Sequence, residues 1–372
     1  MNELPAHDQL ESESLDPEED LVARRRARDE QDYREWCESI YGPVELGQET
    51  FHPADVLELA ADAARRGRDD AAAQIRTDLE QEVCNSFAAP IAIPFHAFLE
   101  GQRSAQMRLL RLRDTWESMV RLLAALALSE AATSPTAFAP LLIRDGKDQA
   151  WRQCKRRDLL SDKLSVRIGL IEGVLHRAGE LGVGLQVGTF LTADVLSEIR
   201  RLNVVRNGFS HEAAKSDAQA RSIIDEVYPV FRDVLLDLRG MQEIKLIRLH
   251  NLQPGGVAEI EELNGHAQSR TCREIKLDPG ALSVAMSAAT VNGMDRVLAR
   301  FGGMTLDLCP FLYAVDDDTG HRTRVFSFKF KAADEWHLEC VADSTTKKSP
   351  ATQHELLLAR LELLIEQPGQ GT

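Results

Sequence analysis

The spacing of hydrophobic positions predicts four helices in the middle of the chain. In each of them apolar side chains recur every three or four residues, which places them on one helix face. The first face carries Leu109, Leu112, Trp116, Val120, Leu123 and Leu126. The four helices are expected at residues 102–131, 162–180, 193–206 and 216–240. Thr192 and Ser216 fit the N-caps of the third and fourth helices, because their hydroxyls can accept a first-turn amide hydrogen bond.

The chain on either side of this helical stretch has a different pattern. Further helices are expected at 17–41, 54–66 and 69–83. After Gly240, β-branched and aromatic segments bounded by turn residues are typical of strands. These strands are expected at 244–249, 258–263, 272–277, 306–315, 324–330 and 336–341. One or two short helices are expected within 280–300, and a last helix after Pro350.

Together these segments predict a mainly α protein of four parts. At 372 residues the chain is long enough for two or three folded domains. The predicted parts are a disordered acidic tail (1–17), a helical N-terminal extension (18–89), a helical bundle (90–240) and an accessory α+β domain (241–372). Within the bundle, residues 144–158 are expected to be a polar connector containing the basic run Lys155-Arg156-Arg157.

The charge is unevenly distributed, and this changes the expectation about partners. The whole chain has a formal net charge of -15, which by itself argues against a nucleic-acid partner. The net charge is -15 for residues 1–101, +4 for residues 102–240 and -4 for residues 241–372. The acidity therefore belongs to the front of the chain, and the middle is mildly basic.

Cysteine spacing and hydropathy do not favour a disulfide framework, a metal site or a membrane span. The six cysteines are scattered, which fits reduced thiols in the cytoplasm. Cys309, His321, His337 and Cys340 could form a zinc set, but eleven residues without a knuckle separate the first two. We therefore expect no metal and no cofactor. The longest purely apolar run, Leu122 to Leu128, is far shorter than the ~18 residues of a bilayer span, so we expect no membrane partner.

The end of the third helix carries side chains suited to chemistry. Arg206 lies four residues past Leu202, on the apolar stripe of this helix. A charge aimed at a buried seam is costly unless something pairs with it or uses it. Gly208 is expected to end the helix, because glycine readily adopts the backbone conformation of a C-terminal cap. Arg206, Asn207 and His211 would then lie within reach of one another.

The string Arg206-Asn207-x-x-x-His211 resembles the signature of HEPN domains, in which a polar residue follows an Arg and a His lies four to six positions after it. The resemblance covers roughly residues 90–240 and includes Pro90-Ile91-Ala92 and the long helix that begins near Gln102. It implies a HEPN-like helical bundle and a homodimer whose two signatures form a metal-independent ribonuclease site. It also implies an RNA substrate, a 2',3'-cyclic phosphate product and a toxin-like setting in bacterial stress or phage defence, with a cognate regulator protein as a further partner.

The three residue types suit RNA cleavage without a metal. Histidine suits proton transfer because its ordinary pKa is ~6.5, so His211 would move the proton. Arginine suits phosphate because its planar fork donates two parallel hydrogen bonds and keeps its charge, so Arg206 would hold the phosphate. Asn207 can both donate and accept, so it would orient the nucleotide or the imidazole. A symmetric dimer would supply a second histidine.

Two interpretations without catalysis stay open. In one, Arg206 is only a paired cation between helices, and His211 is a residue at a helix start. In the other, the helical dimer binds RNA, a nucleotide or a protein partner and acts as an adaptor or regulator.

Overall fold

The computed structural model describes residues 17–46, 49–100, 104–145, 150–210, 216–267, 272–286 and 294–365. By its contacts the chain divides into two compact units, Met1–Leu79 and Glu80–Thr372. The predicted acidic tail lies outside the described residues, except for its last residue, Pro17.

The first unit consists of helices and one small hairpin. Its elements are α1 (Pro17–Tyr41), β1 (Val44–Leu46), β2 (Glu49–Phe51), α2 (Pro53–Glu58) and most of α3 (Ala61–Ser86). The predicted helix at 17–41 is confirmed, whereas the predicted helices at 54–66 and 69–83 have the wrong boundaries. Gly67 lies inside α3, where a Cβ would stand 3.3 Å from the Tyr33 hydroxyl. This glycine therefore permits close packing within the unit rather than ending a helix.

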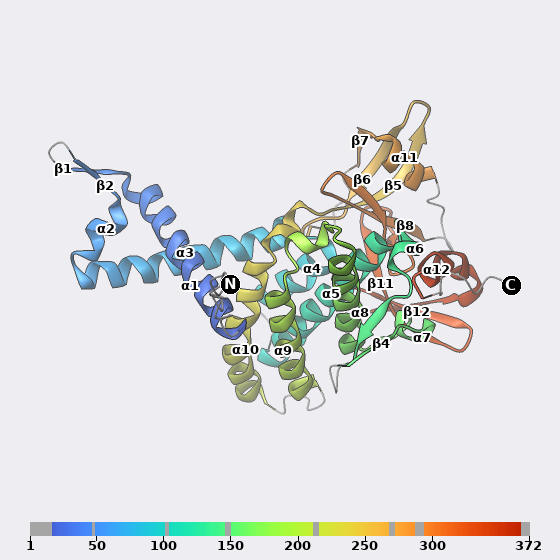
Figure 1. The fold of residues 1–372 in the computed structure, drawn as a ribbon, viewed down its shortest axis with the longest axis horizontal. Helices are drawn as coiled ribbons and strands as arrows, with labels where there is room; N and C mark the ends of the chain where they lie inside the picture. The colour runs from blue at the N-terminus through green and yellow to red at the C-terminus, as the bar shows by residue number, and fades with distance from the viewer. Residues whose placement is uncertain are drawn as a thin grey trace, which may run out of the picture. The chain divides into compact units, whose positions relative to one another are not determined.

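The helices of the second unit follow the predicted periodicity closely. After α4 (Ala89–Leu99) come α5 (Ala105–Ala131), α8 (Leu164–Leu181), α9 (Ala193–Ser210) and α10 (Asp217–Asp237). The helix α5 packs against α8 and α10, and α9 packs against the same two helices, which makes a four-helix bundle (Figure 1). Ser216 caps α10 as predicted, since its Oγ accepts a hydrogen bond from Gln219 N at 3.2 Å.

The second unit also contains an antiparallel sheet of nine strands. The strands are β5 (Lys245–Gln253), β6 (Val257–Glu262), β7 (Cys272–Lys276), β8 (Asp295–Phe301), β9 (Met304–Asp307), β10 (Leu312–Asp316), β11 (Thr323–Ala332), β12 (Glu335–Cys340) and β13 (Thr346–Pro350). Their order is β13-β12-β11-β10-β8-β5-β6-β7, with β9 also paired to β8. The predicted mainly α fold class is therefore wrong: the protein has a helix-rich first part followed by a large antiparallel sheet.

Three features of the sheet differ from the sequence prediction. The strand β8 lies where a short helix was expected, and β13 was not predicted. The single strand expected at 306–315 is divided into β9 and β10. Strand β8 is central in the sheet, and most of its residues are buried, so it lacks the alternation that identifies a half-buried strand.

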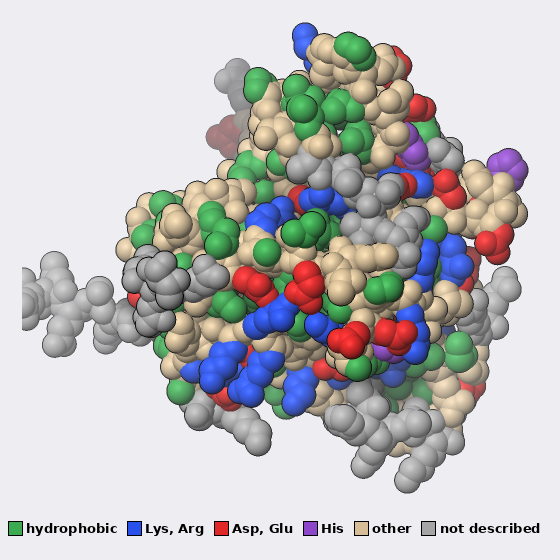
Figure 2. All heavy atoms as spheres, turned by 90° about the vertical axis from the view of Figure 1, so that its right-hand side faces the viewer, with side chains coloured by type: hydrophobic (Ala, Val, Ile, Leu, Met, Phe, Trp, Pro, Cys, Tyr) green, Lys and Arg blue, Asp and Glu red, His purple; other side chains and the backbone are tan. Residues whose placement is uncertain are grey.

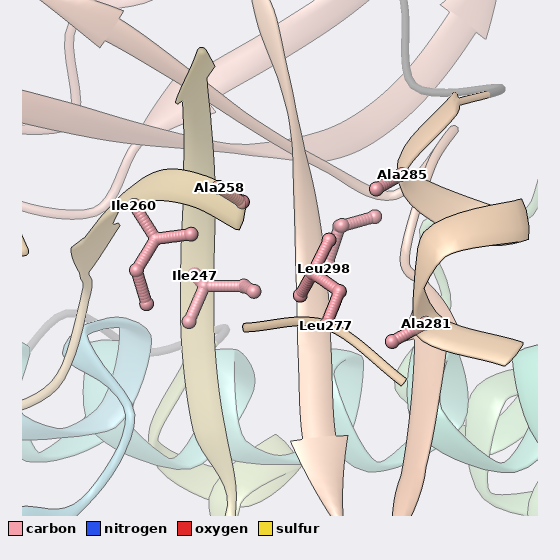
Figure 3. Packing of buried hydrophobic residues seen from close by; sticks show 7 residues of the cluster. All are labelled: Ile247, Ala258, Ile260, Leu277, Ala281, Ala285 and Leu298. Atoms are coloured by element: carbon pink, nitrogen blue, oxygen red, sulfur yellow. The ribbon is translucent and has the colours of Figure 1, made fainter. Parts of the chain in front are cut away.

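One face of the sheet near β5, β6 and β8 is covered by α11 (Pro279–Met286). The cluster between them is entirely aliphatic, with side chains that point toward one another in Figure 3. It consists of Ile247, Ala258, Ile260, Leu277, Ala281, Ala285 and Leu298. Burial of this apolar area fixes the helix against the sheet.

The bundle and the sheet contact each other directly within the second unit. The buried Ser129 hydroxyl of α5 donates to the Asp307 carbonyl at 2.8 Å. The whole run Leu122–Leu128 is buried, because α5 contacts α4, α8 and α10 as well as β9. The expected domain boundary at residue 240 stays a prediction, and these contacts join its two sides.

Candidate functional site

The helix α9 positions the first part of the predicted signature. It begins after Thr192, whose Oγ1 accepts a hydrogen bond from Val195 N at 3.3 Å, which confirms the predicted cap. Ile199 and Leu202, on the predicted apolar stripe, are buried. Arg206 continues this stripe at the edge of the bundle, where 20% of its side chain is exposed.

The predicted helix end at Gly208 is wrong, because α9 continues to Ser210. A glycine inside a helix costs only about 1 kcal/mol relative to alanine, which packing elsewhere along the helix can offset. Arg206 and Asn207 therefore lie within a helix rather than at its end. His211, the third predicted site residue, lies outside the described residues.

Three arginines converge on one carboxylate beside α9. Arg206 pairs with Glu117 of α5. Arg121 lies 3.0 Å from the same carboxylate, and Arg113 lies 3.6 Å from it. These four residues are here called the Glu117 cluster. Three guanidinium groups and one carboxylate give the cluster a net charge of +2.

Electrostatics keep Glu117 ionised inside this cluster. Burial raises the pKa of the Glu117 carboxyl, but Arg121, Arg206 and Arg113 together outweigh burial, so the pKa lies below its ordinary value. Arg121 also lies 3.7 Å from Glu339, a carboxylate that itself pairs with a lysine at 2.6 Å. Arg113 also lies 3.1 Å from Asp114, which lies 3.3 Å from Arg111. Counting Glu339 with its lysine and Asp114 with Arg111, the formal charge of these groups is still +2. Such a surplus favours an additional anion.

An open pocket of about 620 Å³ borders the same helix. Its wall includes residues of α9, of α8 and of the segment around β4 (Trp151–Gln153) and α7 (Arg156–Leu159). We call it the α9 pocket. The lining residues that matter for its chemistry are Arg152, Arg157, Lys163, Arg200, Asn203 and Asn207. Its volume lies within the range typical of small-molecule and nucleotide sites.

Some cations of the α9 pocket form ion pairs with carboxylates, and others are available to bind a ligand. Arg152 holds Asp158 through two hydrogen bonds of 2.7 and 2.8 Å, and Arg200 pairs with Glu172. Arg157 and Lys163 are exposed, and in the described part of the chain no carboxylate forms an ion pair with either.

A buried carboxamide also faces this pocket. Asn203 is 5% exposed, and its Oδ1 has no hydrogen-bond partner among the described residues. A buried polar atom without a partner is unfavourable unless water or a ligand satisfies it. The α9 pocket thus offers two available cations and one unsatisfied acceptor.

Asn207 joins the α9 pocket to the Glu117 cluster. Its side chain is exposed and lines the pocket, while its Oδ1 accepts a hydrogen bond from Arg206 Nη1 at 3.0 Å. The structure thus brings together two of the three predicted site residues, Arg206 and Asn207. Chemically, this arrangement can hold a phosphate near Arg206 and an attached nucleotide in the pocket.

Glu117, Arg157, Lys163 and Asn203 were missed as site residues. The basic run ending at Arg157 was visible in the sequence, but it was assigned to a connector. The pocket forms because α7, α8 and α9 pack together, and no local pattern identifies such a non-local arrangement. The sequence predicts Arg206 as a functional cation but gives no indication that Glu117 pairs with it.

One face of the protein is electrostatically mixed. On the face drawn in Figure 2, Lys and Arg side chains lie among Asp and Glu side chains. Among the described residues, no three His, Cys, Asp or Glu side chains are grouped so that they could hold a metal ion. None of the described helices combines the length and the apolar character needed to cross a bilayer. Comparison with known proteins gives no match to a family model, to a curated protein or to a solved structure.

Proposed function

We propose that this protein is a metal-independent endoribonuclease of the HEPN type, acting in the cytoplasm as a homodimer without a cofactor. Arg206 holds the scissile phosphate, Asn207 orients the nucleotide, and His211 transfers the proton. The products carry a 2',3'-cyclic phosphate. The setting is a bacterial stress or phage-defence response, in which a cognate protein regulates the enzyme.

The observation that carries this proposal is that Asn207 lines the α9 pocket and accepts a hydrogen bond from Arg206 of the Glu117 cluster. The cluster has a surplus of positive charge that attracts a phosphate. The pocket has the volume of a nucleotide site and contains available cations. RNA recognition commonly combines phosphate contacts with a pocket for an unstacked base.

The dimer in this proposal is supported by the outer surface of α9. Val204 and Val205 are 68% and 40% exposed, next to Asn207. A second copy would cover these apolar side chains and bring its own histidine close to the first site. Two such histidines would provide the general acid and the general base of the cleavage reaction.

The test is an RNA cleavage assay in the presence of a chelator. Purified full-length protein should cut RNA with EDTA present, and the new ends should carry a cyclic phosphate. His211→Ala should lower the rate by ~10²–10⁴-fold, the usual contribution of acid–base help. Arg221→Ala, at an exposed position of α10, is the control and should leave the rate unchanged. Cleavage that survives His211→Ala, or a strictly monomeric active protein, would contradict the proposal.

A second candidate is a non-catalytic module that binds RNA or a nucleotide. One observation favours it: Arg206 is already paired with Glu117 of the same chain, so part of its charge is committed. In this case the protein should bind RNA without cutting it. Binding should then depend on Arg157 and Lys163 but remain unchanged in His211→Ala.

A further inference from the structure

A second arginine site lies between the helical bundle and the sheet. Arg167 of α8 is only 3% exposed. Its guanidinium lies over the rings of Phe311 and Phe328, at 5.0 and 5.7 Å from their centroids. An arginine keeps its proton under ordinary conditions, so this buried group carries a full positive charge.

No carboxylate of the described chain neutralises Arg167. Among the described residues none forms an ion pair with it, and the nearest acidic influence comes from exposed Asp162. Burial, together with the like charge of Arg121, lowers the pKa of Arg167 to about 9. Arg121 cannot accept the charge, because it is a cation already held by Glu117 and Glu339. Within the described part of the chain, Arg167 therefore lacks a counter-ion.

The two phenylalanine rings stabilise the charge of the Arg167 guanidinium only in part. Cation–π contact uses the flat faces of the guanidinium, whereas its five N–H donors point outward in the plane. Those donors require acceptors, and no described residue supplies one through a hydrogen bond. A charged group with unsatisfied donors in a buried position is strongly unfavourable.

A small cavity adjoins the guanidinium. Its volume is about 10 Å³, and its lining includes Arg121, Arg167, Ser118 and Ser327. Both serines are buried, and neither hydroxyl has a hydrogen-bond partner among the described residues. A cavity of this size holds one particle close to a water molecule in size. It is too small for phosphate or another polyatomic anion.

We propose that this cavity binds one monatomic anion of chloride size. The anion accepts hydrogen bonds from Arg167 and from the hydroxyls of Ser118 and Ser327, with Arg121 adding attraction. A water molecule in the same place would satisfy donors but leave the charge uncompensated. Since the ligands come from α5, α8 and β11, the anion links the helical bundle to the sheet. This site is separate from the Glu117 cluster and does not depend on the ribonuclease proposal.

Diffraction from crystals of the full-length protein soaked in bromide tests the site directly. Bromide replaces chloride and scatters anomalously, so a peak between Arg167 and Ser327 is expected. The Ser327→Val variant should lose this peak, because it removes a ligand and fills the cavity. A peak absent at saturating bromide, with density that refines as water in the wild type, would overturn the proposal.

Thermal unfolding provides an independent test. At constant ionic strength, replacing gluconate with chloride well above its dissociation constant should raise the melting temperature by about 2–4 °C. Arg167→Met should abolish this chloride dependence, whatever its own melting temperature. Arg221→Met, at an exposed position on α10, should retain it. Equal chloride dependence in both variants would contradict the site, and neither outcome bears on RNA cleavage.

Discussion

Two charge clusters in the second unit are built in opposite ways. In the sheet, one arginine, Arg248, meets three carboxylates. Asp295 accepts a hydrogen bond from it at 2.6 Å, Asp316 accepts another, and Glu261 lies at 3.5 Å. In the bundle, one carboxylate, Glu117, meets three arginines. Counting these groups alone, the first cluster carries a net charge of -2 and the second a net charge of +2.

Burial decides what each cluster can do. The side chains of Arg248 and Glu261 are 5% and 2% exposed. Burial lowers the pKa of Arg248, but Asp316 and Asp295 outweigh it, so the pKa lies above its ordinary value. The Arg248 cluster is therefore buried at its centre, while Asp316 at its edge is 40% exposed. Arg206 is 20% exposed, so solvent reaches the edge of the Glu117 cluster. The two clusters thus differ in the sign of their local charge, which the net charge of -15 for the whole chain does not reveal.

The largest expected effect comes from removing the central cation of the sheet cluster. Arg248→Met removes the guanidinium that buried Glu261 shares with Asp295 and Asp316. The loss should lower the free energy of unfolding by about 3–5 kcal/mol, as for other broken buried ion pairs. Urea denaturation of the full-length protein measures this change.

The corresponding change in the bundle should be much smaller. After Arg206→Met, Glu117 still has Arg113 and Arg121, so the free energy of unfolding should change by less than about 1 kcal/mol. If the two substitutions destabilised the protein equally, the distinction between an internal and an accessible cluster would be wrong.

A second buried network in the sheet region should give the protein a pH-dependent stability. His354 is fully buried, with Nδ1 2.6 Å from the Tyr313 hydroxyl and Nε2 2.8 Å from Ser349 Oγ. Burial lowers the pKa of His354 from 6.5 to about 4. Between these values the unfolded chain binds more protons than the folded one. The contribution of neutral His354 to the free energy of unfolding is therefore fully present above pH 6.5. It decreases as the pH falls toward 4, by at most about 3 kcal/mol.

The measurement is urea denaturation of wild type and His354→Gln across this pH range. The variant should lose the histidine contribution to the slope of unfolding free energy against pH. His321→Gln is the control, because it lies in an exposed turn and leaves the buried network intact. A wild-type slope retained in His354→Gln would show that other groups cause the acid sensitivity.

The sequence predicts the helices of this protein better than its sheet. Helices were identifiable because burial recurs every three or four residues, and the capping roles of Thr192 and Ser216 were local enough to predict. Strand β8 was missed because its partners β5, β9 and β10 bury it, and its run of apolar residues also fits a short helix. The resulting sheet is what overturned the mainly α prediction.

The candidate site was only partly predictable for the same reason. Arg206 and Asn207 could be found because they are adjacent in the sequence and Arg206 breaks an apolar stripe. Glu117 lies 89 positions away from Arg206, and only the packing of α5 against its neighbours brings them together. Gly208 was misjudged because glycine permits a helix end without requiring one. Local patterns therefore identified a cation but not its counter-ion.

A modest expected effect on RNA binding, rather than on stability, tests whether the Glu117 cluster faces a phosphate. Glu117→Gln removes the carboxylate that competes with an external anion for Arg206. RNA should then bind up to about tenfold more tightly, equivalent to ~1.4 kcal/mol. The magnitude of the slope of log affinity against log salt should increase by ~0.7–0.9, because one more phosphate is neutralised by the protein. Fluorescence anisotropy with labelled RNA at several salt concentrations measures both quantities.

Glu180→Gln is the matched control, because it removes the same charge from an exposed position of α8, where the carboxylate pairs with Arg177 at 2.9 Å. If both substitutions strengthen binding equally, the gain reflects overall charge, and Arg206 is a structural cation rather than a phosphate ligand.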